Sequence, residues 1–332
     1  MMTRLLLKTK ARRQLAGKYG DALGVAVLTS LVAGALSILL MLLGDTILPA
    51  FQLPALEDLT DISSNLPSMD RLLDWFGGYI SRISQNLWFL ALSGLLISLA
   101  RGLYRLLVGN VAAVGRERWY VRAAQADVAP PLSVAFSLFR KGQYGKTVLS
   151  MLWTSLWLLI WSSLPSLVLL AGLFPQQLVV YHALTGGSAL TEGLVIRVSR
   201  LYGLPIFFFS PAMVLISLAL GLALFIVYIR KSYSYRLVPY LLADNPSLGA
   251  RQTLRLSRSM TRGSIGRLFM LDLSFLGWVL LCLLCICMPW VTLHLLAPYY
   301  FMTWAEAYKM LRDEATGRGL VRMEDLGYVR VS

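Results

Sequence analysis

The sequence has few charged residues. Asp, Glu, Lys and Arg together make up 14% of its 332 residues, whereas hydrophobic residues make up 57%. About a quarter of the residues of an ordinary soluble domain are charged, so this composition excludes that class. Apolar runs of about 20 residues, the length that crosses a bilayer core as a helix, recur along the chain. The composition therefore predicts an all-α integral membrane protein with one polytopic helical domain over residues 1–332.

Histidine and cysteine are also scarce, with two histidines and three cysteines in the chain. The cysteines Cys282, Cys285 and Cys287 lie within one apolar run, and His294 follows shortly after. A metal site needs more converging ligands than these, and buried cysteines of this kind usually pack as small side chains. The polar segments assigned below to the outside contain no cysteine, which excludes a disulfide framework. We predict no metal and no cofactor.

Catalytic and nucleic-acid-binding motifs are missing as well. The chain contains no Gly-x-Ser-x-Gly elbow and no His-Glu-x-x-His sequence. Gly142–Thr147 resembles a phosphate-binding loop, but the first glycine of that motif would fall at position 140, which is Arg140. The basic residues are spread over four segments without a recognisable nucleic-acid motif. We therefore expect no enzyme activity and no nucleic-acid partner.

Apolar runs predict about six membrane spans, with four to seven compatible with the pattern. The last apolar block, from Leu268 to about Tyr308, is too long for one crossing. Met288-Pro289 near its middle predicts a break, because proline lacks an N–H and clashes with the preceding helical turn. The other four predicted spans are Ala22–Leu43, Leu87–Leu107, Val148–Leu173 and Leu204–Ile229.

The distribution of charge predicts the orientation. Residues 1–20 carry six basic residues and no acid, and the intervals 113–147 and 230–267 are also basic. The interval 44–86 is rich in acids and 174–203 is nearly neutral. Lysine and arginine favour the cytoplasmic side, so both termini, including a tail over 309–332, are predicted to lie inside.

Two amphipathic helices are predicted to lie at the membrane surface. The basic segment 1–20, with leucines at positions 5 to 7 and 15, is expected on the inner leaflet. A second interfacial helix, from Asp70 to about Ile83, is expected in the outside loop 44–86, because apolar and aromatic residues gather there.

Four arginines form a cationic stripe within the basic interval 230–267. At 100° per residue they share one narrow face of a helix. We expect this helix to begin at Pro246, with Asp244 or Asn245 as its cap, and to end at Gly263. The stripe is interpreted as a binding face for anionic lipid or for a membrane protein partner, or simply as an inside-positive loop helix. The four residues are Arg251, Arg255, Arg258 and Arg262.

Asp272 is an acidic residue within the fifth predicted span. An unpaired carboxylate at membrane depth is costly, so a structural ion pair or hydrogen bond with Arg267, Arg101 or Arg105 is one interpretation. The other is a site for a solute or a proton. Arg101 and Arg105 lie one turn apart near the cytoplasmic end of the second span, where long side chains can also reach the interface.

Several sequence motifs resemble a bacterial membrane family called domain of unknown function 975. The motifs are Tyr233–Tyr240, Ala243–Pro246, Leu271–Trp278 and Pro298–Tyr300. The resemblance covers most of the chain. It implies a polytopic protein of the bacterial cytoplasmic membrane and no established activity, so it assigns no catalytic residues.

Three classes of function remain open. We predict a non-enzymatic membrane module (a subunit, scaffold or envelope-associated factor) that contacts anionic lipid of the inner leaflet and possibly a membrane protein partner. The alternative is a transporter or lipid-handling protein that uses Asp272 with Arg101 or Arg105. An intramembrane enzyme ranks third, because no positioned nucleophile or acid–base pair is apparent.

Overall fold

The computed structural model describes residues 4–47, 78, 87–140, 142–186, 190–284, 288–326 and 328. All regular elements in these ranges are helical and none is a strand, which confirms the all-α prediction. Contacts within the chain define two compact units. Unit 1 comprises Met1–Leu36, Gly102–Leu159 and Tyr228–Ser332, and unit 2 comprises Ser37–Arg101 and Ile160–Val227.

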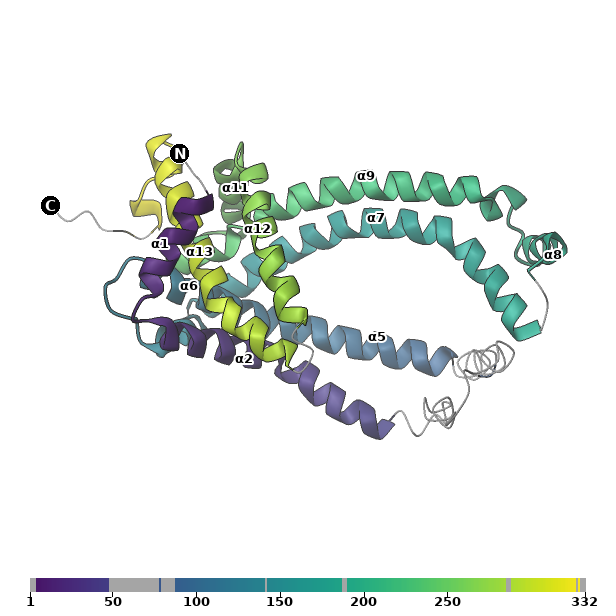
Figure 1. Cartoon of the computed structure of the whole chain (residues 1–332), viewed down its shortest axis with the longest axis horizontal. Helices are drawn as coiled ribbons and strands as arrows, with labels where there is room; N and C mark the ends of the chain where they lie inside the picture. The colour runs from purple at the N-terminus through teal and green to yellow at the C-terminus, as the bar shows by residue number, and fades with distance from the viewer. Residues whose placement is uncertain are drawn as a thin grey trace. The chain divides into compact units, whose positions relative to one another are not determined.

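The described elements follow one another as a series of helices of very different lengths (Figure 1). In the first half they are α1 (Arg4–Leu15), α2 (Tyr19–Ile47), α5 (Leu87–Tyr104), the π-helical turn η2 (Arg105–Gly109), α6 (Asn110–Ala123), the 3₁₀ helix η3 (Leu132–Phe139) and α7 (Tyr144–Gly186). In the second half they are α8 (Glu192–Tyr202), η4 (Ile206–Phe209), α9 (Pro211–Tyr235), α10 (Val238–Asp244), α11 (Ala250–Thr261), α12 (Ile265–Leu284), α13 (Pro289–Gly317) and η5 (Glu324–Leu326).

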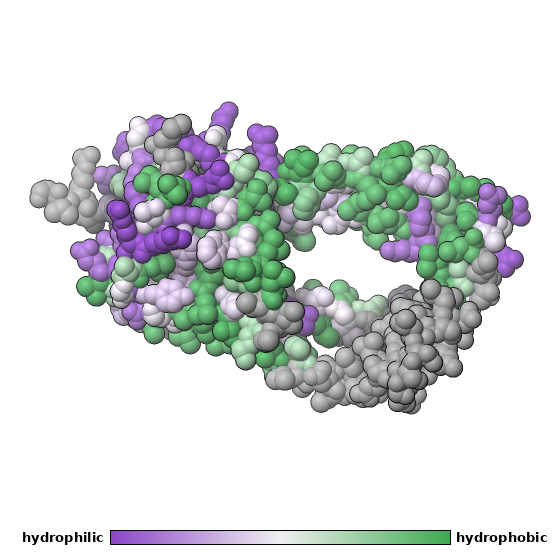
Figure 2. Space-filling model, viewed as in Figure 1, coloured by the Kyte–Doolittle hydropathy of each residue, from purple (hydrophilic) through white to green (hydrophobic). Residues whose placement is uncertain are grey.

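Five of the described helical stretches are long and apolar enough to cross a membrane. Figure 2 shows mostly hydrophobic side chains on the visible surfaces of α7 and α9, and hydrophilic ones gathered over α1 and α11. Residues 289–308, the sixth predicted span, are not among these five stretches. The five are Tyr19–Met41, Ala91–Ala123, Tyr144–Gly186, Pro211–Asp244 and Ile265–Leu284.

Two intervals expected as loops are largely helical. In the basic interval 113–147, α6 continues the second span to Ala123 and η3 follows. In the interval 174–203, α7 runs through Pro175 to Gly186 and α8 follows. Helix α7 also contains Pro165, and prolines are tolerated inside membrane helices more readily than inside soluble ones. The fourth span begins at Pro211, later than predicted, because η4 precedes it.

The amphipathic helix α8 has sequence-encoded ends. The side chain of Thr191 accepts a hydrogen bond from the backbone N–H of Leu194 at 3.4 Å, and Gly203 ends the helix with φ of 63°. Its apolar face buries Leu194 and Val198 in a small cluster with Val179 of α7. The sequence reading missed this helix because its hydrophobic face is only three turns long.

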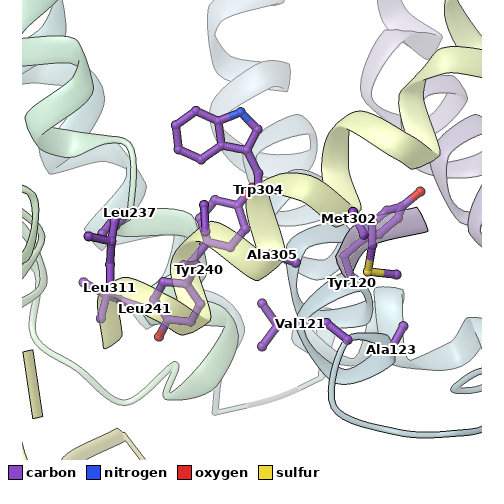
Figure 3. Packing of buried hydrophobic residues seen from close by; sticks show 14 of the residues in the cluster. Tyr120, Val121, Ala123, Leu237, Tyr240, Leu241, Met302, Trp304, Ala305 and Leu311 are labelled. Atoms are coloured by element: carbon purple, nitrogen blue, oxygen red, sulfur yellow. The ribbon is translucent and has the colours of Figure 1, made fainter. Parts of the chain in front are cut away.

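The C-terminal half of α13 lies at the centre of the core of unit 1. Every residue from Met302 to Tyr308 is buried, and Trp304 and Tyr308 are 0% exposed. Figure 3 shows side chains from α6 and from the α10 region, among them Val121 and Tyr240, packed around this helix. A helix segment that is buried all round lies inside a protein core or inside a membrane bundle. Helix α13 continues past residue 309, the predicted start of the tail, and ends at Gly317.

Helix α1 packs part of its apolar face against protein, whereas its place on the inner leaflet stays a prediction. Its buried residues Leu7, Ala11 and Leu15 join the core of unit 1, where α1 contacts α13. Leu5 points elsewhere and is 79% exposed. The sequence pattern identified an apolar face but could not say what covers it. The interfacial helix predicted from Asp70 to Ile83 lies, except for Gly78, outside the described residues.

Two lysines bind the C-terminal end of α6. Lys18 Nζ donates to the carbonyls of Ala123, at 3.1 Å, and Ala126. Lys309 Nζ donates to the carbonyl of Ala124 at 2.6 Å. The last carbonyls of a helix have no partner within the helix and carry partial negative charge, so cations there are stabilising. These contacts fasten the start of α2 and the middle of α13 to α6.

Candidate functional site

Three hydrogen-bond donors hold the carboxylate of Asp272, which lies in α12. Tyr233 donates its hydroxyl to Oδ2 at 2.7 Å. Tyr300 donates to Oδ1 at 3.1 Å, and Trp304 Nε1 donates to the same oxygen at 2.8 Å. A partly buried carboxylate without such partners would be costly, and these donors from α9 and α13 lower that cost.

Neither Arg267 nor Arg105, the two predicted partners that share unit 1 with Asp272, binds its carboxylate. Arg267 instead donates to the hydroxyl of Ser264 at 2.7 Å, and Arg105 is exposed in η2. Arg101 is exposed in α5 and belongs to unit 2. Arg267 precedes Asp272 by five positions, which places the two side chains roughly 140° apart around the helix. The actual donors lie 28 to 39 residues away in sequence, so no local pattern could have named them.

Arg236, which was not predicted from the sequence, contacts two of the three donors to Asp272. Its Nη2 donates to the hydroxyl of Tyr300 at 2.7 Å. Its guanidinium lies 4.8 Å from the centroid of the Trp304 ring. Arg236 therefore orients two of the three donors to Asp272. The only indication in the sequence was that Arg236 lies within Tyr233–Tyr240, one of the motifs that resemble domain of unknown function 975.

The Asp272 carboxylate lines a groove between α12 and α13 with a volume of about 510 Å³. We call it the Asp272 groove. Its polar lining comes from Tyr233, Asp272 and Tyr300 at one end. A mostly apolar cavity with a few converging polar groups is the usual form of a ligand-binding site. The remaining lining residues are Phe269, Leu273, Phe275, Leu276, Val279, Leu293, Leu296, Ala297 and Phe301.

The four predicted arginines all have exposed side chains, on or just beyond α11. None of them forms an ion pair with an acid among the described residues. The opposite side of α11 is buried, and there Ser257 and Thr261 donate to the carbonyl of Ser234 at 2.8 and 3.4 Å. These bonds fix which side of α11 faces outward. We call the set Arg251, Arg255, Arg258 and Arg262 the arginine face.

The predicted start of this helix is wrong, and its predicted end is close. Helix α11 begins at Ala250 with Gly249 as its N-cap. Asp244 ends α10 instead, and Asn245 Oδ1 accepts from the backbone N–H of Ser247 at 2.9 Å. The side chains expected to cap α11 are thus committed to other partners. The helix ends at Thr261, and Gly263 has φ of 83°, a conformation that favours glycine.

Asp244 is the centre of a second polar network, which anchors the C-terminal segment. Tyr308 donates to Oδ2 at 2.6 Å, and Tyr328 donates to Oδ1 at 2.9 Å. Arg312 Nη1 lies 3.6 Å from Oδ2, and both charged side chains are 6% exposed. Arg312 also donates to the Tyr328 hydroxyl at 2.5 Å. This network joins α10, α13 and the residue beyond η5.

Tyr328 gives the network a predicted pH dependence. Burial, and then the nearby Asp244, raises the pKa of Tyr328 to about 12 from its usual 10.0. The folded state therefore holds this proton more tightly than the unfolded state. The stability that it contributes is complete below about pH 10 and is lost as the pH rises towards about 12.

A Tyr328→Phe variant tests this dependence. Between about pH 10 and 12 its unfolding temperature should fall less steeply than that of the unaltered chain. Tyr202→Phe, at an exposed tyrosine of α8, is the control and should keep the original slope. Parallel curves for the unaltered chain and Tyr328→Phe would show that Tyr328 does not contribute.

The described part of the chain defines a class of protein. All its regular elements are helices, and five apolar stretches have spanning length. These features are those of a multi-pass helical membrane protein. The chain belongs to the family described as Protein of unknown function (DUF975), whose model matches residues 1–315. The predicted resemblance is therefore confirmed. No curated protein and no solved structure matches the chain.

Proposed function

We propose that the chain is a non-enzymatic membrane module that binds anionic lipid headgroups through its arginine face. It would lie in the bacterial cytoplasmic membrane with both termini inside. The observation that carries the proposal is the orientation of α11. Four arginines are exposed without a described acidic partner, while the hydroxyls of Ser257 and Thr261 hold the other side of the helix to α9.

Electrostatics supports this assignment. A basic residue near an anionic leaflet contributes about 1 kcal/mol of attraction, and the planar guanidinium of arginine matches the oxygens of a phosphate. The arginine face lies in the most basic interval of the chain, 230–267, which the inside-positive rule assigns to the cytoplasm. An acidic membrane protein partner would recognise the same surface by the same charge.

A matched pair of double variants tests the proposal. Arg255→Gln with Arg258→Gln removes two exposed charges, three residues apart, from α11. Arg197→Gln with Arg200→Gln removes two exposed charges at the same spacing from α8. Retention of phosphatidylglycerol by the purified full chain in neutral detergent is measured by native mass spectrometry. We expect the α11 variant to bind this lipid about tenfold more weakly, and the α8 variant to bind it as the unaltered chain does.

Two results would contradict the proposal. Equal losses in both variants would mean that any exposed cation pair attracts the lipid and that the arginine face has no special role. An unchanged lipid affinity in the α11 variant would mean that these arginines only set the orientation of the chain in the membrane. Retention of a protein in stoichiometric amount, instead of lipid, would favour an acidic membrane protein partner over lipid headgroups at the arginine face.

The second candidate is a transporter or lipid-handling protein that uses Asp272. The Asp272 groove favours it, since it brings a carboxylate to an apolar cavity. Arg267 and Arg105, two of the arginines first assigned to this role, do not contact Asp272, whose hydrogen bonds come from Tyr233, Tyr300 and Trp304. This candidate predicts loss of solute movement in Asp272→Asn with normal abundance.

A further inference from the structure

The Asp272 carboxylate retains capacity for one more hydrogen bond. An ionised carboxylate offers about four acceptor positions. Tyr233, Tyr300 and Trp304 occupy three of them. Because Asp272 itself lines the groove, a donor inside the groove can reach the carboxylate. The three protein donors hold that carboxylate in place before any ligand arrives.

The lining of the groove favours a positive group at this end. Asp272 is the only acidic residue in the lining, and no described lysine or arginine lines it. The aromatic rings of Tyr233 and Phe269 form one edge-to-face pair there, with centroids 5.9 Å apart. Phe275 and Tyr300 form another at 5.3 Å. Aromatic faces attract cations, as the Nζ of Lys8 at 4.2 Å from the centroid of the Phe275 ring illustrates, and the carboxylate of Asp272 lies in the same lining.

The rest of the groove favours a hydrocarbon chain. Beyond Asp272 the lining continues along α12 through Leu276 to Val279, a distance of roughly 10 Å at the rise of an α-helix. Leu293 and Ala297 of α13 line the facing side. The α12 helix is itself one of the stretches long and apolar enough to cross a membrane. The groove therefore joins one polar end to an apolar stretch, as an amphiphile does.

We propose that the Asp272 groove binds a membrane lipid whose headgroup carries a protonated amine. The amine occupies the free acceptor position of Asp272, and the acyl chain lies between α12 and α13. A headgroup that is only anionic is disfavoured there by the carboxylate. This site is separate from the arginine face and does not depend on it.

Photolabelling of the purified full chain in a neutral sugar detergent tests the site. The probe is an alkyl amine with a photoreactive group in its chain, and labelled peptides are identified by mass spectrometry. Two competitors share one acyl chain, namely lysophosphatidylethanolamine, which carries an amine, and lysophosphatidylglycerol, which does not. We expect labelling to concentrate on α12 and α13. Lysophosphatidylethanolamine should halve this labelling at a concentration at least about tenfold lower than lysophosphatidylglycerol needs.

Variants separate the charge from the cavity. Asp272→Asn keeps the shape and an acceptor for the protein donors but removes the charge, so the tenfold preference for the amine lipid should disappear. Ala297→Phe fills the groove and keeps the charge, so labelling of α12 and α13 should be lost. Leu280→Phe is the control for added bulk, since Leu280 is 52% exposed and does not line the groove.

Three results would overturn the proposal. One is labelling spread evenly over the exposed apolar helices. Another is equal competition by the two lipids, which would show that the groove takes hydrocarbon without recognising the headgroup. The third is a full preference for the amine lipid in Asp272→Asn. If that variant does not fold, the comparison of Ala297→Phe with Leu280→Phe and the choice between the two lipids still decide the question.

Discussion

Replacing Asp244 with alanine is expected to lower the free energy of unfolding by about 3–5 kcal/mol. The change leaves Arg312, whose side chain is 6% exposed, without the buried carboxylate that it faces at 3.6 Å. It also removes the acceptor of Tyr308, a residue that is 0% exposed. Desolvated donors, and a buried guanidinium left with only the exposed carboxylate of Asp313, account for the size of the effect. Thermal unfolding of the purified chain in neutral detergent measures it.

Asp313 provides a matched control for this experiment. Its carboxylate contacts the same guanidinium, with Arg312 Nη2 at 3.2 Å from Oδ1, but its side chain is 61% exposed. Water replaces an exposed partner, so Asp313→Ala should cost less than about 1 kcal/mol. Equal losses for the two variants would contradict the assignment of Asp244 as the centre of the network. A large loss for Asp244→Ala should also release the C-terminal segment, which limited proteolysis would detect near Tyr328.

Replacing Gly115 with alanine is expected to destabilise unit 1 by about 3 kcal/mol or more. Gly115 lies in α6 against η3, and a Cβ added there would meet the carbonyl oxygen of Ala135 at 1.8 Å and its carbon at 2.9 Å. Both are backbone atoms, so neither can move aside as a flexible side chain can. The helix and η3 must separate, which would also disturb the packing of Trp119, whose Nε1 donates to the Pro130 carbonyl at 2.8 Å.

Gly266 is the control for this substitution. It lies in α12, and an added Cβ would meet nothing within 4 Å. Alanine favours a helix over glycine by about 1 kcal/mol, so Gly266→Ala should leave the unfolding temperature unchanged or raise it slightly. If Gly115→Ala unfolds at the temperature of the unaltered chain, the close approach of α6 to η3 is not a constraint on this fold.

The variants proposed above fall into two groups, those that should change stability and those that should change lipid binding. The Asp244 network and the contact at Gly115 hold unit 1 together, so their variants should lose stability first and ligand binding only as a consequence. Variants of the arginine face change an exposed surface. Ala297→Phe changes the lining of the Asp272 groove. Those should change lipid binding while the unfolding temperature stays near its original value. Measuring both quantities for every variant separates the two kinds of effect.

The sequence by itself determined the class of protein, the family, and the position of two helix ends. Apolar runs of spanning length predicted an all-helical membrane protein, because only a helix satisfies its own backbone groups in lipid. Met288-Pro289 correctly separated α12 from α13, since a proline without an N–H is best placed at the start of a helix. Gly263 correctly marked the region where α11 ends, because its positive φ suits glycine. These signals are local, and each can be recognised without knowing its neighbours in space.

Only the tertiary structure decided what covers each apolar face and which groups meet. An apolar stripe looks the same whether lipid or protein buries it, so the sequence could not show that α1 packs on α13. Nor could it show that residues 302–308 are buried at the centre of the core of unit 1. Asp272 was correctly singled out as a residue that needs partners. Its donors Tyr233, Tyr300 and Trp304 come from two other helices, because hydrogen bonds between distant segments exist only after those segments have packed.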